Sequence, residues 1–201
     1  MQMVETDQAS VEARLCAGEI ACADCGEALR PWGHARERPL RDHGEMVRVR
    51  PRRSLCGGCS EARGKLTTHV LLPAVMLLRR MDLVAVIGEA LTVIYVEGRR
   101  RREVAAAAGA PLATVRGWRR RFQERAEEVR LHFTALAHRW DPELGGIEPR
   151  GSVMTDALEA MGMAAAAWVR RFGPEPLWSL VAAASAGRLL SNTSYPLPSP
   201  G

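Results

Sequence analysis

The sequence predicts a mainly α-helical protein that begins with a small β module. Three patterns support this fold class: two Cys-x-x-Cys pairs flank a segment with strand-like alternation, apolar residues recur at helical spacing after about residue 80, and Gly and Pro divide the helical part. The expected units are a flexible lead-in over 1–19, the β module over 20–73, a three-helix unit over 80–140, a helical hairpin over 152–190 and a disordered tail over 191–201.

The two Cys-x-x-Cys pairs, Cys22/Cys25 and Cys56/Cys59, are spaced so that both sulfurs of a pair can reach one ion. Four thiolates close a tetrahedral shell, which is typical of structural zinc, whereas catalytic zinc keeps an open position. A redox role would favour a single pair near a βαβ pattern, and a disulfide framework would favour a secretory start, but this chain starts with a polar, acidic segment. We therefore expect a zinc ribbon with one structural Zn²⁺ on these four cysteines, and Cys16 outside the site.

A hairpin between the pairs would return the second pair beside the first. We expect a strand over 29–40, a turn at Asp42-His43-Gly44 and an edge strand over 46–52 that contains Pro51. The second strand alternates between valines on one face and arginines on the other, namely Val47 and Val49 against Arg48, Arg50 and Arg52. Residues 66–72 are expected to add a third strand before Pro73. The histidines between the pairs, His34 and His43, are expected as surface or turn residues.

The segment 80–140 has the pattern of a helix-turn-helix. A helix over 82–96 is expected with Asp82 as its N-cap, followed by a short helix over 101–108. Gly109 suits the turn, and Pro111 suits the start of a third helix that runs on to His138. Small and apolar residues are expected on the inner side of this unit, namely Ala105, Val115, Trp118 and Phe122.

The C-terminal part predicts two more helices, over 153–172 and 175–190, separated by Gly173-Pro174. An apolar stripe on the first of them is too large to stay exposed: Leu158, Met161, Trp168, Val169 and Phe172. We expect this hairpin either to cap the three-helix unit or to form a homodimer.

Positive charge is clustered along the chain, and nearly all of it is arginine. Residues 30–53 hold eight arginines against three acids, and residues 99–125 hold nine against two. Such clusters are typical of phosphate binding, so double-stranded DNA is the expected partner. Arg116 and Arg120 lie one helical turn apart and are expected to read bases, while Thr114 is expected to hold a phosphate. The full set of expected DNA contacts is Arg48, Arg50, Arg52, Arg99, Arg100, Arg101, Arg102, Thr114, Arg116, Arg119, Arg120 and Arg121.

Five motifs together resemble a known family: Cys22-Ala-Asp-Cys25, Leu29-Arg-Pro-Trp-Gly33, Cys56-Gly-Gly-Cys59, Thr68-His-Val-Leu-Leu-Pro73 and Thr114-Val-Arg-Gly-Trp118. They look like those of a family of actinobacterial proteins that join a zinc-ribbon-like domain of unknown function (DUF6431) to a helix-turn-helix. The resemblance covers about residues 20–190. It implies a mobile-element or transposase-related context and a transposase partner, and it implies no enzymatic activity.

Catalysis is not expected from the sequence. A common transposase active site needs three carboxylates on an α/β domain, but the residues after 125 predict helices. The acids there are expected on the linker or on helix surfaces, namely Asp141, Glu143, Asp156 and Glu159. The longest apolar stretch, over 83–96, is interrupted by Gly88 and Glu89 and is too short to cross a membrane.

The sequence therefore predicts a non-catalytic, sequence-specific DNA-binding protein of the cytoplasm, associated with the nucleoid and with a mobile element. Two alternatives stay open at this point. One is a transcriptional regulator of its own locus, which would make the same DNA contacts. The other is an adaptor whose zinc ribbon binds a protein partner such as a transposase or polymerase.

Overall fold

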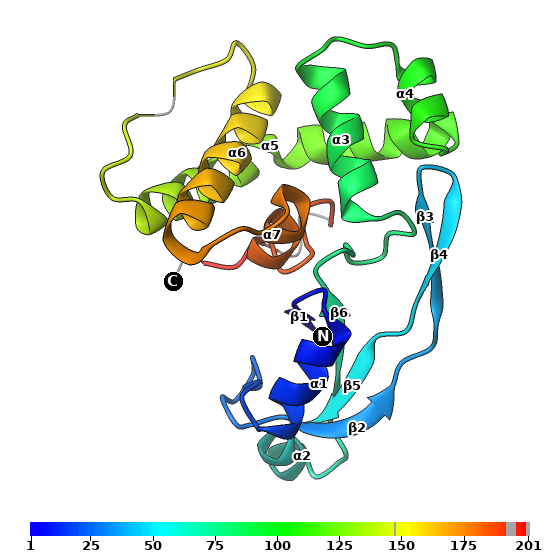
Figure 1. The fold of residues 1–201 in the computed structure, drawn as a ribbon, viewed down its shortest axis with the longest axis vertical. Coiled ribbons are helices and arrows are strands. Elements are labelled where there is room, and N and C mark those ends of the chain that lie inside the picture. Colours follow the sequence, from blue (N-terminus) through cyan, green and yellow to red (C-terminus); the bar gives the residue numbers. More distant parts are fainter. Residues whose placement is uncertain (147, 192–195, 200–201) are drawn as a thin grey trace.

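The computed structural model describes residues 1–146, 148–191 and 196–199. The fold is mixed α and β. A sheet module built from the N-terminal third lies at one end of the molecule, and the helices lie at the other (Figure 1). A long two-stranded hairpin leaves the sheet module and runs up to the helical part.

The sheet module contains a four-stranded sheet in the order β1-β6-β5-β2. Strand β1 pairs parallel to β6, and the other two pairings are antiparallel. Two short helices, α1 and α2, belong to this module (Figure 1). The elements are β1 (Gln2–Val4), α1 (Gln8–Cys16), β2 (Arg30–His34), β5 (Arg52–Leu55), α2 (Gly57–Arg63) and β6 (Thr68–Pro73).

The prediction of a flexible lead-in over residues 1–19 is wrong. Helix α1 is capped by the Asp7 carboxylate, and it buries Val11 and Leu15 completely, in one cluster with Leu29 of the sheet module. These two apolar residues are four apart and therefore share one helix face. That single stripe, together with the β1 pairing, is enough to fix the segment.

The hairpin consists of β3 (Arg38–Asp42) and β4 (Glu45–Val49) and forms a sheet of its own. The predicted strands over 29–40 and 46–52 are therefore wrong in extent, because each is divided between the two sheets. The predicted strand over 46–52 is divided at Pro51, which has no N–H to donate to a neighbouring strand. The Pro51 carbonyl accepts a hydrogen bond from the Ala35 amide. Helix α2 is also absent from the sequence prediction, which left residues 57–65 without structure.

Three helices follow: α3 (Val84–Tyr95), α4 (Arg101–Ala107) and α5 (Leu112–Trp140). Their positions agree with the sequence prediction, but Asp82 is not the N-cap of α3. Its buried carboxylate instead accepts two hydrogen bonds from the Arg41 guanidinium, and Leu83 occupies the cap position without a side-chain hydrogen bond. An arginine from β3 outcompetes the helix amides for this carboxylate, since a charge-assisted bidentate pair is the stronger interaction.

The last two helices, α6 (Val153–Phe172) and α7 (Leu177–Ala184), contact each other, and each also packs on another helix. Helix α6 lies along the C-terminal part of α5 (Figure 1), while the Trp178 ring of α7 lies directly on Gly88 of α3. The segment therefore caps the helical unit within the chain, and formation of a homodimer stays a prediction. The second helix also ends at Ala184 rather than at 190, at a turn with left-handed Ala186 and Gly187.

The predicted apolar stripe of α6 is only partly correct. Met161 is buried, but Val169 and Phe172 are exposed. The face against α5 is made mostly of alanines, which let the two helix backbones approach closely: Ala157, Ala160, Ala164, Ala165 and Ala167. In the expected disordered tail, Leu197 is buried and its N–H donates to Glu128, so this residue is packed on α5. Residues 192–195, 200 and 201 of that tail lie outside the described residues.

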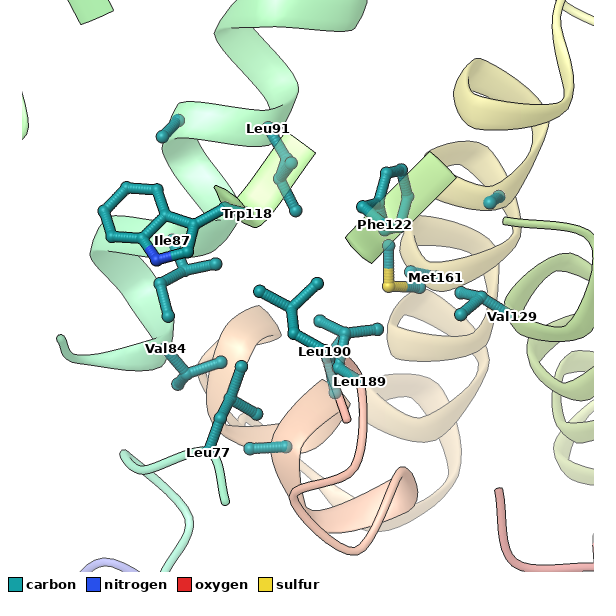
Figure 2. Close-up of a cluster of buried hydrophobic side chains, with 14 of the residues drawn as sticks. Leu77, Val84, Ile87, Leu91, Trp118, Phe122, Val129, Met161, Leu189 and Leu190 are labelled. Atoms are coloured by element: carbon teal, nitrogen blue, oxygen red, sulfur yellow. The ribbon is translucent and has the colours of Figure 1, made fainter. Parts of the chain in front are cut away.

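The main core lies where α3, α5, α6 and the segment after α7 meet. Figure 2 shows Ile87 and Leu91 of α3 with Trp118 and Phe122 of α5, and Leu190 between these helices and α6. Within the described ranges, no helix is both long and apolar enough to cross a lipid bilayer.

Candidate metal centre and basic surface

The four predicted ligands come together at the far end of the sheet module. One ligand atom from each of Cys22, Cys25, Cys56 and Cys59 lies within 4.8 Å of every other. The Sγ atoms of Cys25 and Cys56 are 3.3 Å apart, and those of Cys22 and Cys59 are 3.7 Å apart. Sulfurs at the corners of a tetrahedron around zinc would be about 3.8 Å apart, given a Zn–S bond of about 2.3 Å.

Each pair sits in a turn shaped by its own backbone. In the first pair, the Asp24 amide donates to the Cys22 sulfur. In the second pair, Cys56 N-caps α2, and its sulfur accepts the amide of Cys59. The sheet brings the pairs together, because β2 follows the first and β5 leads directly into the second.

The donor set fits a metal ion that prefers sulfur. Cys22, Cys56 and Cys59 are buried, and Cys25 is exposed at the edge. Four unpaired thiols packed in this way could bind a metal such as zinc, with amide donors already directed at two of the sulfurs. Cys16 lies elsewhere, on α1, where its thiol contacts Glu12.

The structure adds one residue that the sequence prediction missed. His69 of β6 is buried, and its Nε2 lies 3.5 Å from the Cys22 sulfur. With Cys22, Asp24 and Cys59 it forms a second group of ligand atoms of suitable spacing. Burial lowers the pKa of His69. In the sequence, His69 is recognisable only as the second residue of a β strand. The pairing of β6 with β5 in the fold then places His69 beside the thiols.

The second cluster is a basic groove beside the N-terminal half of α5. It encloses about 640 Å³ between that helix and the loop that precedes α3. Thr114, Arg116, Arg120 and Arg121 line it, as predicted for one face of the helix. Across from them lie Arg79 and Arg80, which the sequence prediction did not include.

Arg116 connects this groove to a further group of arginines. It also lines a neighbouring depression together with Arg100, Arg101 and Arg102 at the start of α4. The structure therefore joins the predicted contacts before α4 with those on α5 into one continuous surface. We call this set the basic surface: Arg79, Arg80, Arg100, Arg101, Arg102, Thr114, Arg116, Arg120 and Arg121.

Other predicted DNA contacts lie outside the basic surface or are engaged within the fold. Arg52 is largely buried and pairs with Glu12 of α1, so it holds the sheet module together and is not available to DNA. Arg119 does not line the groove and lies beside Tyr95 of α3, whose pKa is raised by burial. Arg99 lies near Glu97 and Glu103. Arg48 is exposed and pairs with Glu37, and Arg50 is exposed at the base of the hairpin.

The tip of the β3–β4 hairpin contacts the helices next to the basic surface. The His43 ring bonds to Asp42 and to Glu89 of α3, and both bonds raise the pKa of His43. Nearer the base, the Arg41 backbone pairs with Met81 and Leu83 on either side of its ion pair with Asp82. The hairpin therefore ties the sheet module to the start of α3.

No family model, curated protein or solved structure matches this chain.

Proposed function

We propose that this protein is a non-catalytic, sequence-specific DNA-binding protein. The basic surface is the observation that carries this proposal. It gathers eight arginines from three separate segments, the loop before α3, the start of α4 and the start of α5. A surface of this charge density attracts a polyanion with regularly spaced phosphates.

The arginines of the basic surface are little neutralised by the protein itself. Among the residues that the structure describes, Asp82 is the acid that lines the groove, and Arg41 holds its carboxylate. Glu103 lines the neighbouring depression and lies 3.8 Å from Arg99. Arg120 comes within 3.8 Å of Glu124, but its side chain stays largely exposed. Surface pairs at such distances contribute about 0–1 kcal/mol, so the guanidinium remains available to a phosphate or base.

The arrangement of α4 and α5 supports a helix-turn-helix interpretation. The two helices are joined by a short turn in which Gly109 has a left-handed conformation. Val115 and Trp118 are buried against α3 and α4, which leaves Arg116 and Arg120 on the outer side. Arginine on such a face can form two hydrogen bonds to guanine in the major groove.

We further propose that the four cysteines hold one structural zinc ion. The close packing of the thiols and the amide bonds to Cys22 and Cys56 support this assignment. The ion would stabilise the sheet module, from which the β3–β4 hairpin extends toward α3 and α4. Zinc would thus contribute to DNA binding by fixing the fold, without a catalytic step.

Three acids of the C-terminal part support a non-catalytic role, because arginines and backbone groups already engage their carboxylates. Asp141 pairs with Arg170 at 2.6 Å, and Glu159 pairs with Arg150 at 3.0 Å. Asp156 accepts the amide of Arg150 at the start of α6. Association with a transposase remains part of the proposal and rests on the family resemblance alone. A pull-down with the product of an adjacent transposase gene would test it.

Selection of bound duplexes from a random DNA library, followed by fluorescence anisotropy at several salt concentrations, tests the DNA-binding role. Arg116→Ala and Arg120→Ala should each weaken binding to the selected site by about 1–3 kcal/mol and relax its sequence preference. Arg100→Ala should weaken all sequences about equally. Arg139→Ala removes an exposed arginine at the other end of α5 and serves as the matched control.

Absence of binding to any duplex at low salt would overturn the proposal. Equal losses on all sequences for Arg116→Ala and Arg120→Ala would remove sequence-specific recognition by these two residues.

A further inference from the structure

The loop before α3 forms a fixed wall of the basic groove. Arg79 is exposed and has a left-handed backbone conformation, with φ of 59°. Such a conformation is uncommon for a residue other than glycine and points to a local constraint. Its neighbour Arg80 donates to the carbonyl of Leu190, which anchors the loop on the core. Arg79 is therefore presented to solvent from a rigid base.

Arg80 also has unused hydrogen-bonding capacity. Its Nε is buried and has no hydrogen-bond partner among the residues that the structure describes. Burial lowers the pKa of Arg80, and repulsion by the nearby Arg121 adds to this effect, while the Asp82 carboxylate opposes it. An anion in the groove would relieve this repulsion.

The floor of the groove is a helical glycine, Gly117. Glycine in a helix interior destabilises a protein by about 0.5–1 kcal/mol relative to alanine, so a glycine at this position needs a structural explanation. Here the missing side chain leaves room for the guanidinium of Arg121 beside the helix backbone. A Cβ at this position would lie 2.9 Å from Nη1 of Arg121, whose guanidinium lies back over the glycine.

We propose that this groove holds the sugar-phosphate backbone of one DNA strand. The strand would pass over Gly117, with phosphates bound between Arg79 and Arg80 on the loop and Arg121 on α5. Arg116 and Arg120 lie on the same helix face and would reach into the adjoining major groove. This inference rests on the proposed function, and it adds the loop arginines and the glycine as the residues that position the duplex.

The chemistry of the groove favours a phosphodiester over other anions. Arginine binds phosphate oxygens with paired, charge-assisted hydrogen bonds, and three guanidiniums around one path suit a chain of single negative charges.

The glycine gives a test in which stability and binding should change in opposite directions. Gly117→Ala should preserve or raise the unfolding midpoint in urea, because the displaced atom is the end of a flexible side chain. It should weaken DNA binding about 5- to 20-fold, since the methyl group displaces the Arg121 guanidinium, one of the proposed phosphate-binding groups. Gly162→Ala is the matched control: it is an exposed helical glycine on α6 with no atom near its Cβ position. It should raise stability and leave DNA affinity unchanged.

Removal of the loop charge gives a second, independent readout. Arg79→Ala should reduce the slope of log affinity against log salt by about one, the change expected for one lost phosphate contact. Arg139→Ala should leave the slope unchanged.

If the wild-type protein binds no DNA, the proposed function itself fails. If it binds, and Arg116→Ala weakens it while Gly117→Ala and Arg79→Ala do not, only this inference is overturned. Tighter binding to RNA than to duplex DNA of the same sequence would also overturn it.

Discussion

The backbone of Gly44, at the tip of the β3–β4 hairpin, lies directly against the backbone of Gly109 in the turn between α4 and α5. A Cβ on Gly109 would overlap the amide of Gly44 and the carbonyl carbon of His43. The two glycines are 65 positions apart, so this contact joins the metal-binding module to the turn that precedes the arginine-bearing helix. Together with the His43–Glu89 contact, it fixes the hairpin tip on the helical unit.

Gly109→Ala should destabilise the protein by about 2–4 kcal/mol, because it combines a left-handed backbone with a direct overlap. Urea unfolding followed by circular dichroism measures the change. Gly98→Ala is the control, since Gly98 is also left-handed but has no atom within reach of its Cβ position. It should lose only about 1–2 kcal/mol, the cost of the left-handed backbone. Equal losses for the two variants would show that the Gly44 contact contributes nothing.

The helices could be predicted from the sequence because each has strong local signals. Gly109 and Pro111 mark the turn between α4 and α5, and Ser152 caps α6 directly before the predicted start of that helix. The cysteine site was predictable for a similar reason, because the spacing within each pair already limits what it can bind.

The remaining features depend on contacts between distant segments. The role of Asp82 was predicted wrongly because Arg41, its true partner, lies on another element. Arg52 belongs to the same alternating series as Arg48, yet its guanidinium forms an ion pair with Glu12. The position of His69 depends on strand pairing, and Arg79 and Arg80 become part of a site only when their loop packs beside α5. A linear charge pattern contains none of this information.

The ion pair between Arg41 and Asp82 gives a second prediction. Arg41→Met should cost about 3–5 kcal/mol, because it leaves a buried carboxylate without its cation. Adding Asp82→Asn should restore a large part of that stability, since the remaining group is then neutral. Chemical unfolding of both single variants and the double variant gives the coupling energy between the two sites. Strict additivity of the two changes would contradict the proposed pairing.

The metal centre gives a third prediction. Protein purified without added metal should contain about one zinc ion per chain by elemental analysis. Cys56→Ser should abolish this content and unfold the sheet module, because metal binding contributes to folding energy in small modules of this kind. Cys16→Ser is the control and should keep both the metal and the fold. A fully folded Cys56→Ser protein without zinc would refute the structural role of the metal.

The two alternative groups of ligand atoms, one with Cys25 and one with His69, can be distinguished in the same experiment. His69→Ala should retain zinc if the four cysteines are the ligands, and the ion should be released faster to a chelator, because a supporting contact to Cys22 is lost. Loss of zinc from His69→Ala with retention in Cys25→Ser would instead assign the site to the alternative group that contains the histidine.

The last prediction concerns acid stability and involves His132 of α5. This ring is buried, its Nε2 bonds to the carbonyl of Ala184, and burial lowers the pKa of His132 below its ordinary value near 6.5. The unfolded chain therefore binds a proton that the folded chain does not, over the range from about pH 6.5 down to the folded pKa. Stability from this group is present above about pH 6.5 and is lost as the pH falls, by at most about 1.4 kcal/mol per pH unit. Urea unfolding between pH 7 and pH 5 should show this slope, and His132→Gln should reduce it. The control variant His138→Gln, which replaces the nearest histidine along α5, should leave the slope unchanged. An unchanged slope in His132→Gln would assign the acid sensitivity to other groups.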